Sequence, residues 1–353
     1  MIPVFDGHND VLLHLYRSGR PDAERAFLEG RPGGHLDLAK ARAGGFAGGL
    51  FAIFVPSDEA GGDGAHVEAL MTQASYDIPL PPCLDLTASQ RATLHMASLL
   101  VRLERASDGA VRICRSVPEI KAAAEAGAIG AVLHVEGAEA IDPEFRLLDI
   151  LHGACLRSLG PVWSRPNAFG HGVPFRFPSG PDIGPGLTDL GRELVRRCNA
   201  LKIAVDLSHL NEAGFWDVVS LTEAPLVASH SNAHALCPHS RNLLDRQLDA
   251  IRDSGGLVGV NFATSFLRAD GRRDPDTGLD DVIRHVDHLL SRLGEDGVGL
   301  GSDFDGATVP APIGDAAGLP RLADALRERG MGEALLRKLL WENWLGVLER
   351  TWA

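Results

Sequence analysis

Short apolar segments alternate along the chain with longer segments in which apolar residues recur at helical spacing. Most of the short segments are continuous hydrophobic runs, which is typical of parallel strands buried on both faces. The longer segments Leu187–Leu201 and Glu333–Arg350 each carry one apolar stripe, which predicts a helix packed against a core. The predicted strands are Pro3–Phe5, Gly49–Val55, Val111–Cys114, Ile129–Val135, Cys155–Pro161, Ile203–Leu207, Leu226–Ala228, Leu257–Phe262 and Val298–Leu300.

This alternation of strand and helix patterns predicts an α/β fold with a parallel sheet, either closed as a barrel or open and doubly wound. We expect a (β/α)8 TIM-like barrel, as a single domain over residues 1–353. Nine predicted strands are one too many, and Val111–Cys114 lies among charged residues, so we place it outside the barrel. Residues 6–10 contain no glycine-rich phosphate loop, which argues against a Rossmann-type nucleotide fold.

Two long segments, Ser57–Asp85 and Ser164–Gly186, are rich in glycine, proline and aspartate, and each follows a predicted strand. In a barrel, loops that follow strands lie at the C-terminal face, where active sites are built. We therefore expect both segments to border the functional site.

The composition argues against several classes of protein, among them nucleic-acid-binding and membrane-spanning proteins. The chain is 45% hydrophobic and 23% charged, as in ordinary globular proteins. Its net charge of −13 and lack of a basic run argue against nucleic acid as a partner. No apolar stretch approaches the ~20 residues that span a bilayer, and no signal-peptide pattern is visible. Five scattered cysteines predict reduced thiols, so we expect a cytoplasmic protein without a membrane partner.

Histidine and acidic residues recur just past the C-terminal ends of the predicted strands. Each has an ordinary structural interpretation by itself: Glu136 could cap a helix, and His209 and His230 could be hydrogen-bonded core histidines. Because strand ends converge on one cavity in a barrel, their repetition at equivalent positions indicates a shared site. The residues are His8, Asp10, Glu136, His209, His230 and Asp303.

Imidazole and carboxylate ligands without a thiolate fit zinc. Three histidines, one aspartate and one glutamate are too many for one catalytic zinc, so we expect two zinc ions per chain, with Glu136 as the bridging carboxylate. A hydroxide that bridges the two ions would be the nucleophile. Asp303 would accept its proton and pass it to the leaving group.

Six motifs resemble the signature of the renal (membrane) dipeptidase family of zinc peptidases, within the amidohydrolase superfamily. The resemblance extends to Glu342-Asn343-Trp344 and so covers nearly the whole chain. The motifs are Asp6-Gly7-His8-Asn9-Asp10, Glu136-Gly137, Val205-Asp206-Leu207-Ser208-His209, Ser229-His230-Ser231, Arg241-Asn242 and Gly301-Ser302-Asp303-Phe304-Asp305-Gly306.

The resemblance implies a (β/α)8 barrel with a dinuclear zinc centre, and a homodimer is an expectation from it alone. It also implies that Arg241 binds the substrate carboxylate, a role that suits the forked geometry of a guanidinium group. The implied metal roles are His8 and Asp10 on one ion, His209 and His230 on the other, Glu136 bridging, and Asp303 as the acid/base.

The chain departs from the family in one place. Family members usually carry Thr-Leu-Thr-His after the fourth barrel strand, and this histidine helps to polarise the scissile carbonyl. Here Trp163 falls at that position, and an indole can donate one hydrogen bond but carries no charge. Because the loss of an oxyanion donor typically costs ~10²–10³ in rate, we expect a substitute from the same loop. The candidates are Arg165, Asn167 and His171.

Three functions follow from these patterns. The leading hypothesis is a zinc-dependent dipeptidase that hydrolyses dipeptides, including those with a D-residue at the C-terminal position. The alternative is a binuclear metal amidohydrolase that acts on another small amide or a lactone, which Trp163 favours. A non-enzymatic metal-binding barrel is the third, and Asp303 argues against it, because a scaffold has no need of a free proton-transfer group.

Overall fold

The parallel strands form a ring, and the computed structural model describes residues 1–57 and 63–353. Hydrogen bonds connect the strands in the order β8-β6-β5-β2-β1-β11-β10-β9. A bridge between Asp206 and Val227 joins β8 to β9 and nearly closes the ring. The strands are β1 Val4–Asn9, β2 Phe46–Phe54, β5 Ile129–Glu136, β6 Leu156–Gly160, β8 Ala204–Val205, β9 Val227–Ser231, β10 Leu257–Val260 and β11 Val298–Leu300. The predicted (β/α)8 barrel is confirmed.

The strand that we placed outside the barrel is indeed outside it. β4 (Val111–Ile113) pairs only with the first residues of β5, from Ile129 to Ala131. Farther along β5, residues from Leu133 to Glu136 pair with β6 instead. β4 therefore branches from the ring at its base, where the strands begin.

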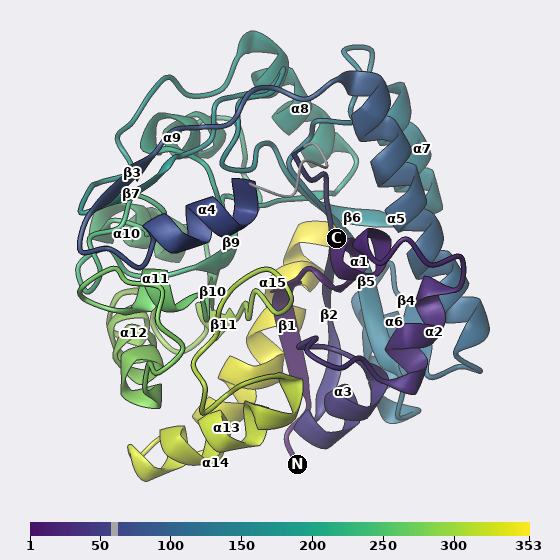
Figure 1. The fold of residues 1–353 in the computed structure, drawn as a ribbon, viewed down its shortest axis with the longest axis vertical. Helices are drawn as coiled ribbons and strands as arrows, with labels where there is room; N and C mark the ends of the chain where they lie inside the picture. Colours follow the sequence, from purple (N-terminus) through teal and green to yellow (C-terminus); the bar gives the residue numbers. More distant parts are fainter. Residues whose placement is uncertain (58–62) are drawn as a thin grey trace.

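Helices surround the ring of strands in Figure 1. The predicted helices Leu187–Leu201 and Glu333–Arg350 are present, but the second is divided by a π-helical stretch, η2 (Lys338–Glu342). The other bounds are α1 Val11–Arg17, α2 Ala23–Glu29, α3 Leu38–Gly44, α4 Asp63–Leu70, α5 Leu86–Ala106, α6 Val117–Glu125, α7 Arg146–Ala154, α8 Asp189–Ala200, α9 Glu212–Val219, α10 Asp245–Asp253, α11 Thr264–Leu267, α12 Leu279–Leu293, η1 Ala316–Gly318, α13 Leu319–Glu328, α14 Glu333–Arg337 and α15 Asn343–Trp352.

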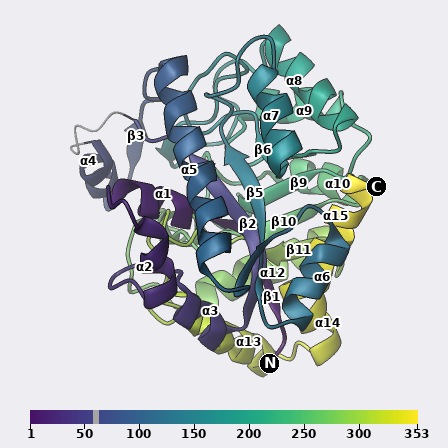
Figure 2. The same cartoon turned by 90° about the vertical axis from the view of Figure 1, so that its right-hand side faces the viewer.

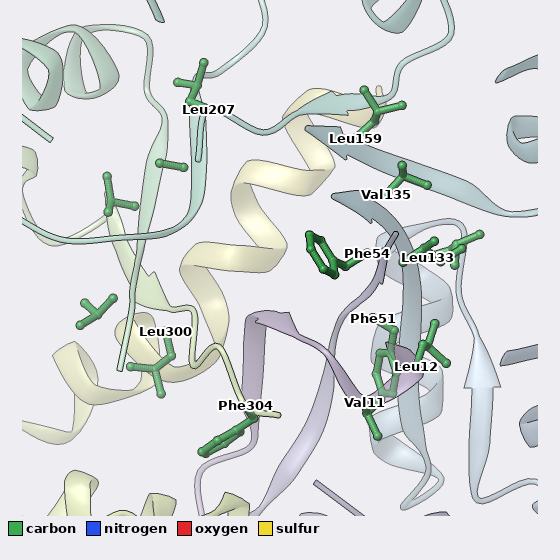
Figure 3. Packing of buried hydrophobic residues seen from close by; sticks show 14 of the residues in the cluster. Val11, Leu12, Phe51, Phe54, Leu133, Val135, Leu159, Leu207, Leu300 and Phe304 are labelled. Carbon is green, nitrogen blue, oxygen red and sulfur yellow. The ribbon is translucent and has the colours of Figure 1, made fainter. Parts of the chain in front are cut away.

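The core lies between the ring and the surrounding helices. Figure 3 shows Leu12 of α1 next to Phe51 of β2, with Leu133 of β5 above them and Val135 farther along the same strand. All four side chains are buried. Apolar residues on this face of the strands explain why the runs lack polar alternation, since the opposite face lines the interior of the barrel.

The two long loops pair with each other. β3 (Tyr76–Ile78) lies in the first loop and β7 (Phe175–Phe177) in the second, and they form an antiparallel ribbon. Tyr76, Ile78 and Phe177 are buried together with Phe266 in a small apolar cluster. The loops were predicted to lie at the C-terminal face, and their pairing makes them one structural unit. Residues 58–62 of the first loop lie outside the described residues.

The C-terminal helix α15 closes the base of the barrel. It lies within the ring in Figure 1, and Figure 2 places it on the side opposite β3 and α4. Trp344 is fully buried, packs against Phe5, and donates its indole N–H to the carbonyl of Leu300 at 2.8 Å. A Cβ at Gly7 or Gly299 would overlap the Trp344 ring, so both positions require glycine.

Trp344→Ala is expected to lower the free energy of unfolding by about 3–5 kcal/mol, because it leaves a large cavity and an unpaired carbonyl at the base. Urea denaturation measures the change. The half-exposed Trp216 of α9 is the control, and Trp216→Ala should cost about 1 kcal/mol or less. Equal losses in the two variants would contradict the closing role of Trp344.

Two predictions from composition are also tested. All five cysteines are free thiols, four of them buried, as expected. Among the described residues, no helix combines the length and apolar character needed to cross a membrane.

Candidate metal centre

The structure brings all six predicted chemistry-bearing residues to the C-terminal end of the ring. Each comes from a strand or from the turn directly after one, and each side chain is buried or nearly so. They are His8 in β1, Asp10 directly after it, Glu136 at the end of β5, His209 after β8, His230 in β9 and Asp303 after β11.

Glu136 lies at the centre and faces two groups of ligands with its two oxygens. Its Oε2 is 3.7 Å from Nε2 of His8. Its Oε1 is 3.0 Å from Nε2 of His209 and 3.4 Å from Nε2 of His230. The two histidine Nε2 atoms are only 3.1 Å apart. A carboxylate that presents a different oxygen to each group is arranged to bridge two cations.

A second group gathers around His8. Its Nε2 lies 3.3 Å from Oδ2 of Asp10. The possible ligand atoms of His8, Asp10 and Asp303 all lie within 4.8 Å of one another, as do those of His8, Glu136 and His230. His8 therefore belongs to both clusters, and Asp303 lies closer to His8 and Asp10 than the sequence alone indicated.

The electrostatics of the cluster favour a bound cation. Burial raises the pKa of Glu136 well above its usual range, and burial also raises the pKa of Asp303, with Asp10 adding to both effects. Burial lowers the pKa of His209 and of His230 well below the usual value. These histidines are therefore neutral, which is the form that binds metal.

His8 shows the same attraction for positive charge in another way. Burial alone would lower its pKa, but the nearby charges of Glu136 and Asp10 outweigh burial and raise the pKa to about 10. Among the described groups, both ring nitrogens of His8 and Oδ1 of Asp10 are buried without a hydrogen-bond partner. Buried polar atoms without partners are rare, and a divalent metal ion would satisfy one ring nitrogen of His8 together with the carboxylate of Asp10. The residues present fit a metal site.

The backbone at two of these positions is in the left-handed region. His209 has φ of 66° and Asp303 has φ of 59°, a conformation that few residues other than glycine adopt. Gly306 approaches Asp10 and Asp303 so closely that a side chain there would overlap their carboxylates. Strained backbone of this kind persists at functional sites because the surrounding structure holds it in place.

Supporting hydrogen bonds hold several of these side chains, and the sequence did not predict this role for the residues that supply them. Nδ1 of His209 lies 2.8 Å from Oγ of Ser164, and Nδ1 of His230 lies 2.7 Å from Oγ of Ser229. Asn261 donates to Oδ2 of Asp303 at 2.9 Å. Ser229 stands in the Ser229-His230-Ser231 motif, but nothing in the sequence connects Ser164 or Asn261 with a ligand residue.

Arg241 is buried beside the ligands. Its Nη1 donates to Oγ of Ser231 at 2.9 Å and its Nη2 to the carbonyl of His230 at 3.0 Å. Its Nε has no partner, and no carboxylate among the described residues lies within ion-pair distance of its guanidinium. Burial lowers the pKa of Arg241 to about 10, so it remains charged at neutral pH. A buried cation without a counterion favours an anionic ligand.

Trp163 forms an apolar wall next to His209. Its ring centroid is 5.7 Å from that of His209, 4.8 Å from that of Phe54 and 5.7 Å from that of Phe175. Phe175 belongs to the β3–β7 ribbon, so the paired loops border the site as the sequence predicted. Trp163 is thus placed where it can contact a ligand.

The three residues proposed as substitutes for the missing histidine differ in their surroundings. Arg165 is fully buried and directs its donors to Glu139, Ser57 and the carbonyl of Val55. This guanidinium packs against Phe54 and Trp163 and supports the aromatic wall.

Asn167 donates to the carbonyl of Pro161 and accepts from Phe169 and Gly170, so its amide is engaged within its own loop. His171 makes no hydrogen bond to a candidate ligand within the described part of the chain, and its Nδ1 is buried without a partner. A role of Arg165, Asn167 or His171 in polarising the carbonyl, and substrate binding by the last two, stay predictions from the sequence.

Comparison with known proteins agrees with this geometry. Residues 1–352 match the family model described as membrane dipeptidase (peptidase family M19). A protein encoded in the pqqA 5′ region of Klebsiella pneumoniae is 52% identical over 255 residues, which are 72% of this chain and 94% of that protein.

Two solved structures resemble the whole chain. A metallopeptidase from Rhodobacter sphaeroides, crystallised with a phosphinate mimic of the dipeptide L-Ala-D-Ala, is 56% identical with a TM-score of 0.97, covering 99% of both chains. The structure of dipeptidase AC, a metallopeptidase of family M19, is 55% identical with a TM-score of 0.96 and the same coverage. The chain therefore belongs to the membrane dipeptidase family, peptidase family M19, whose members are metal-dependent dipeptidases.

Proposed function

We propose that this protein is a zinc-dependent dipeptidase with two zinc ions per chain, and that dipeptides with a D-residue at the C-terminal position are among its substrates. His8 and Asp10 would hold one ion and His209 and His230 the other, and Glu136 would be shared by both. The ligand of the R. sphaeroides relative, an L-Ala-D-Ala mimic, supports the choice of substrate. A homodimer and a cytoplasmic location stay predictions from the sequence.

The observation that carries the substrate class is the buried, unpaired charge of Arg241. A dipeptide has a C-terminal carboxylate, and a carboxylate beside Arg241 supplies the counterion that the described residues do not. A lactone or a neutral amide would leave the charge uncompensated. The geometry therefore favours a dipeptide over the alternative amide or lactone substrate.

The metal and the residues around it would have separate roles in the reaction. Zinc supplies Lewis acidity and lowers the pKa of water to near neutrality. Asp303 is partly buried, and Asn261 holds its carboxylate in place, so it is suited to carry a proton to the departing amine. Trp163 and Phe175 exclude water from one side of the site and offer an apolar surface to a substrate side chain.

The direct test is an assay of the zinc-loaded protein with a panel of dipeptides, their C-terminal amides and small lactones. We expect turnover of free dipeptides, L-Ala-D-Ala included, and much slower turnover of the amides. Chelator should abolish activity and zinc should restore it. Turnover of lactones or amides without turnover of any dipeptide would overturn the proposal.

Arg241→Ala is expected to lower kcat/KM for a free dipeptide by roughly 10²–10³-fold, because a charge-assisted hydrogen bond to the carboxylate is lost. Most of the loss should appear in KM, and the slow turnover of the dipeptide amide should hardly change. Arg241→Lys, which keeps the charge without the fork, should fall between. Arg196→Ala, at an exposed arginine of α8, is the control. An equal loss on the free dipeptide and its amide would contradict this role of Arg241.

A further inference from the structure

A hydrogen-bonded chain runs from Asp206, which follows β8, through Ser229 to the ring of His230. Oγ of Ser229 lies 2.5 Å from Oδ2 of Asp206 and 2.7 Å from Nδ1 of His230. All three side chains are almost completely buried. The far side of the imidazole, Nε2, faces Oε1 of Glu136 at 3.4 Å.

The other hydrogen bonds of Asp206 settle the direction of this chain. Its Oδ1 accepts the backbone N–H of Ser208 at 3.1 Å and that of Ser229 at 2.8 Å. Because a carboxylate only accepts, the Ser229 hydroxyl must donate to Oδ2. That leaves a lone pair of Ser229 facing the imidazole, so Nδ1 of His230 carries the ring proton. Nε2 is then unprotonated and directed at Glu136.

We propose that Asp206 and Ser229 are positioning residues, which hold His230 in the single tautomer whose Nε2 can bind a metal ion. The inference rests on the metal-binding role of His230 in the proposed function. Partners that orient metal-binding histidines in this way are often carboxylates, and here a serine hydroxyl is interposed. His209 differs, because among the described residues its partner Ser164 has no carboxylate behind it to fix the direction.

Asp206→Asn should reverse the direction of the hydrogen bonds that connect residue 206, Ser229 and His230. The asparagine Oδ1 will stay with the two backbone N–H donors, since an NH₂ group there would face two donors. The NH₂ group then replaces Oδ2 and donates to Ser229, whose hydroxyl turns to donate to Nδ1 of His230. The ring proton moves to Nε2. A metal ion that binds there must displace this proton and leave the serine hydroxyl without an acceptor.

Two measurements follow from this reversal. In metal-free protein with ¹⁵N-labelled histidine, long-range ¹H–¹⁵N NMR spectra should show His230 protonated at Nδ1 in the wild type and at Nε2 in Asp206→Asn. Competition with a chromophoric chelator should show that Zn²⁺ binds about 10–100-fold more weakly to the variant, at the site that His230 would form with His209.

A second substitution separates positioning from simple loss of structure. Ser229→Ala removes the hydroxyl, so Asp206→Asn can no longer force the unfavourable tautomer. The double variant Asp206→Asn/Ser229→Ala should therefore bind Zn²⁺ more tightly than Asp206→Asn alone, close to Ser229→Ala. If the two residues only stabilise the fold, the two losses add and the double variant is the weakest of the three.

The control is Asp37→Asn. Asp37 is equally buried and also accepts two backbone N–H groups, from Arg31 and Lys40, but it is hydrogen-bonded to no histidine among the described residues. It should lose stability without losing Zn²⁺ affinity. The positioning role would be overturned if Asp206→Asn kept the wild-type tautomer and Zn²⁺ affinity, or if the losses in the double variant were additive. If the tautomer switches as expected but the wild type binds no Zn²⁺ at His230, Asp206 and Ser229 still fix the tautomer, and the proposed function fails.

Discussion

Replacing Glu136 with glutamine is expected to lower kcat/KM by about 10⁴-fold or more, since lost metal binding removes both the Lewis acid and the activated water. Glu136 presents one oxygen to His8 and the other to His209 and His230, so it is shared by both groups of ligands. Glutamine has nearly the same shape, but it offers one neutral oxygen and an NH₂ group that repels a cation. Elemental analysis after zinc loading should find fewer than two ions per chain.

The matched control for this variant is Glu144→Gln. Glu144 is an exposed glutamate that precedes α7, paired loosely with Arg146 at 3.6 Å. It should keep wild-type zinc content and activity. A Glu136→Gln protein that retains two zinc ions and more than a tenth of the activity would show that Glu136 does not bridge the ions.

The Asp303→Asn variant is expected to lose about 10²–10⁴-fold in kcat while KM and zinc content stay close to wild type. Asparagine preserves the size of the side chain and can still accept a hydrogen bond from Asn261, but it cannot transfer a proton. Burial raises the pKa of Asp303 above its ordinary value, which helps this carboxyl group to hold a proton for the leaving amine. Steady-state kinetics on one dipeptide and elemental analysis give the three quantities.

The zinc content decides between two roles of Asp303. Its oxygens lie close to those of Asp10 and to His8, so a metal-binding role is the competing explanation. Loss of zinc in parallel with activity would assign Asp303 to the ligands and remove it as the proton-transfer group. Asp296→Asn, at a highly exposed aspartate before β11, should change neither quantity.

Much of the fold and the composition of the site could be predicted from the sequence because both depend on local patterns. Apolar runs such as Ile129–Val135 mark strands buried on both faces, and the ionisable residues that follow them mark the C-terminal end of the barrel. The position of β4 outside the ring also followed from its charged neighbours.

Other features depend on contacts between distant segments and leave no local signal. β3 and β7 are three residues each, too short for alternation to be recognised, and they pair across about a hundred residues of chain. The π-helical stretch before α15 interrupts a sequence whose apolar stripe reads as one helix. Asp206 stands in a motif that the sequence analysis singled out, but only the folded chain shows that it holds His230 through Ser229.

The position of β1 has a consequence for how the protein is made. β1 lies between β2 and β11, where Asp6 pairs with Leu300, and α15 covers the base of the ring. During translation, the first strand therefore waits for its second neighbour until residues 298–300 have left the ribosome. Asp303 and Trp344 follow later still. The nascent chain therefore cannot complete its set of candidate metal-binding and proton-transferring side chains before Asp303 has emerged, although the other five are made much earlier.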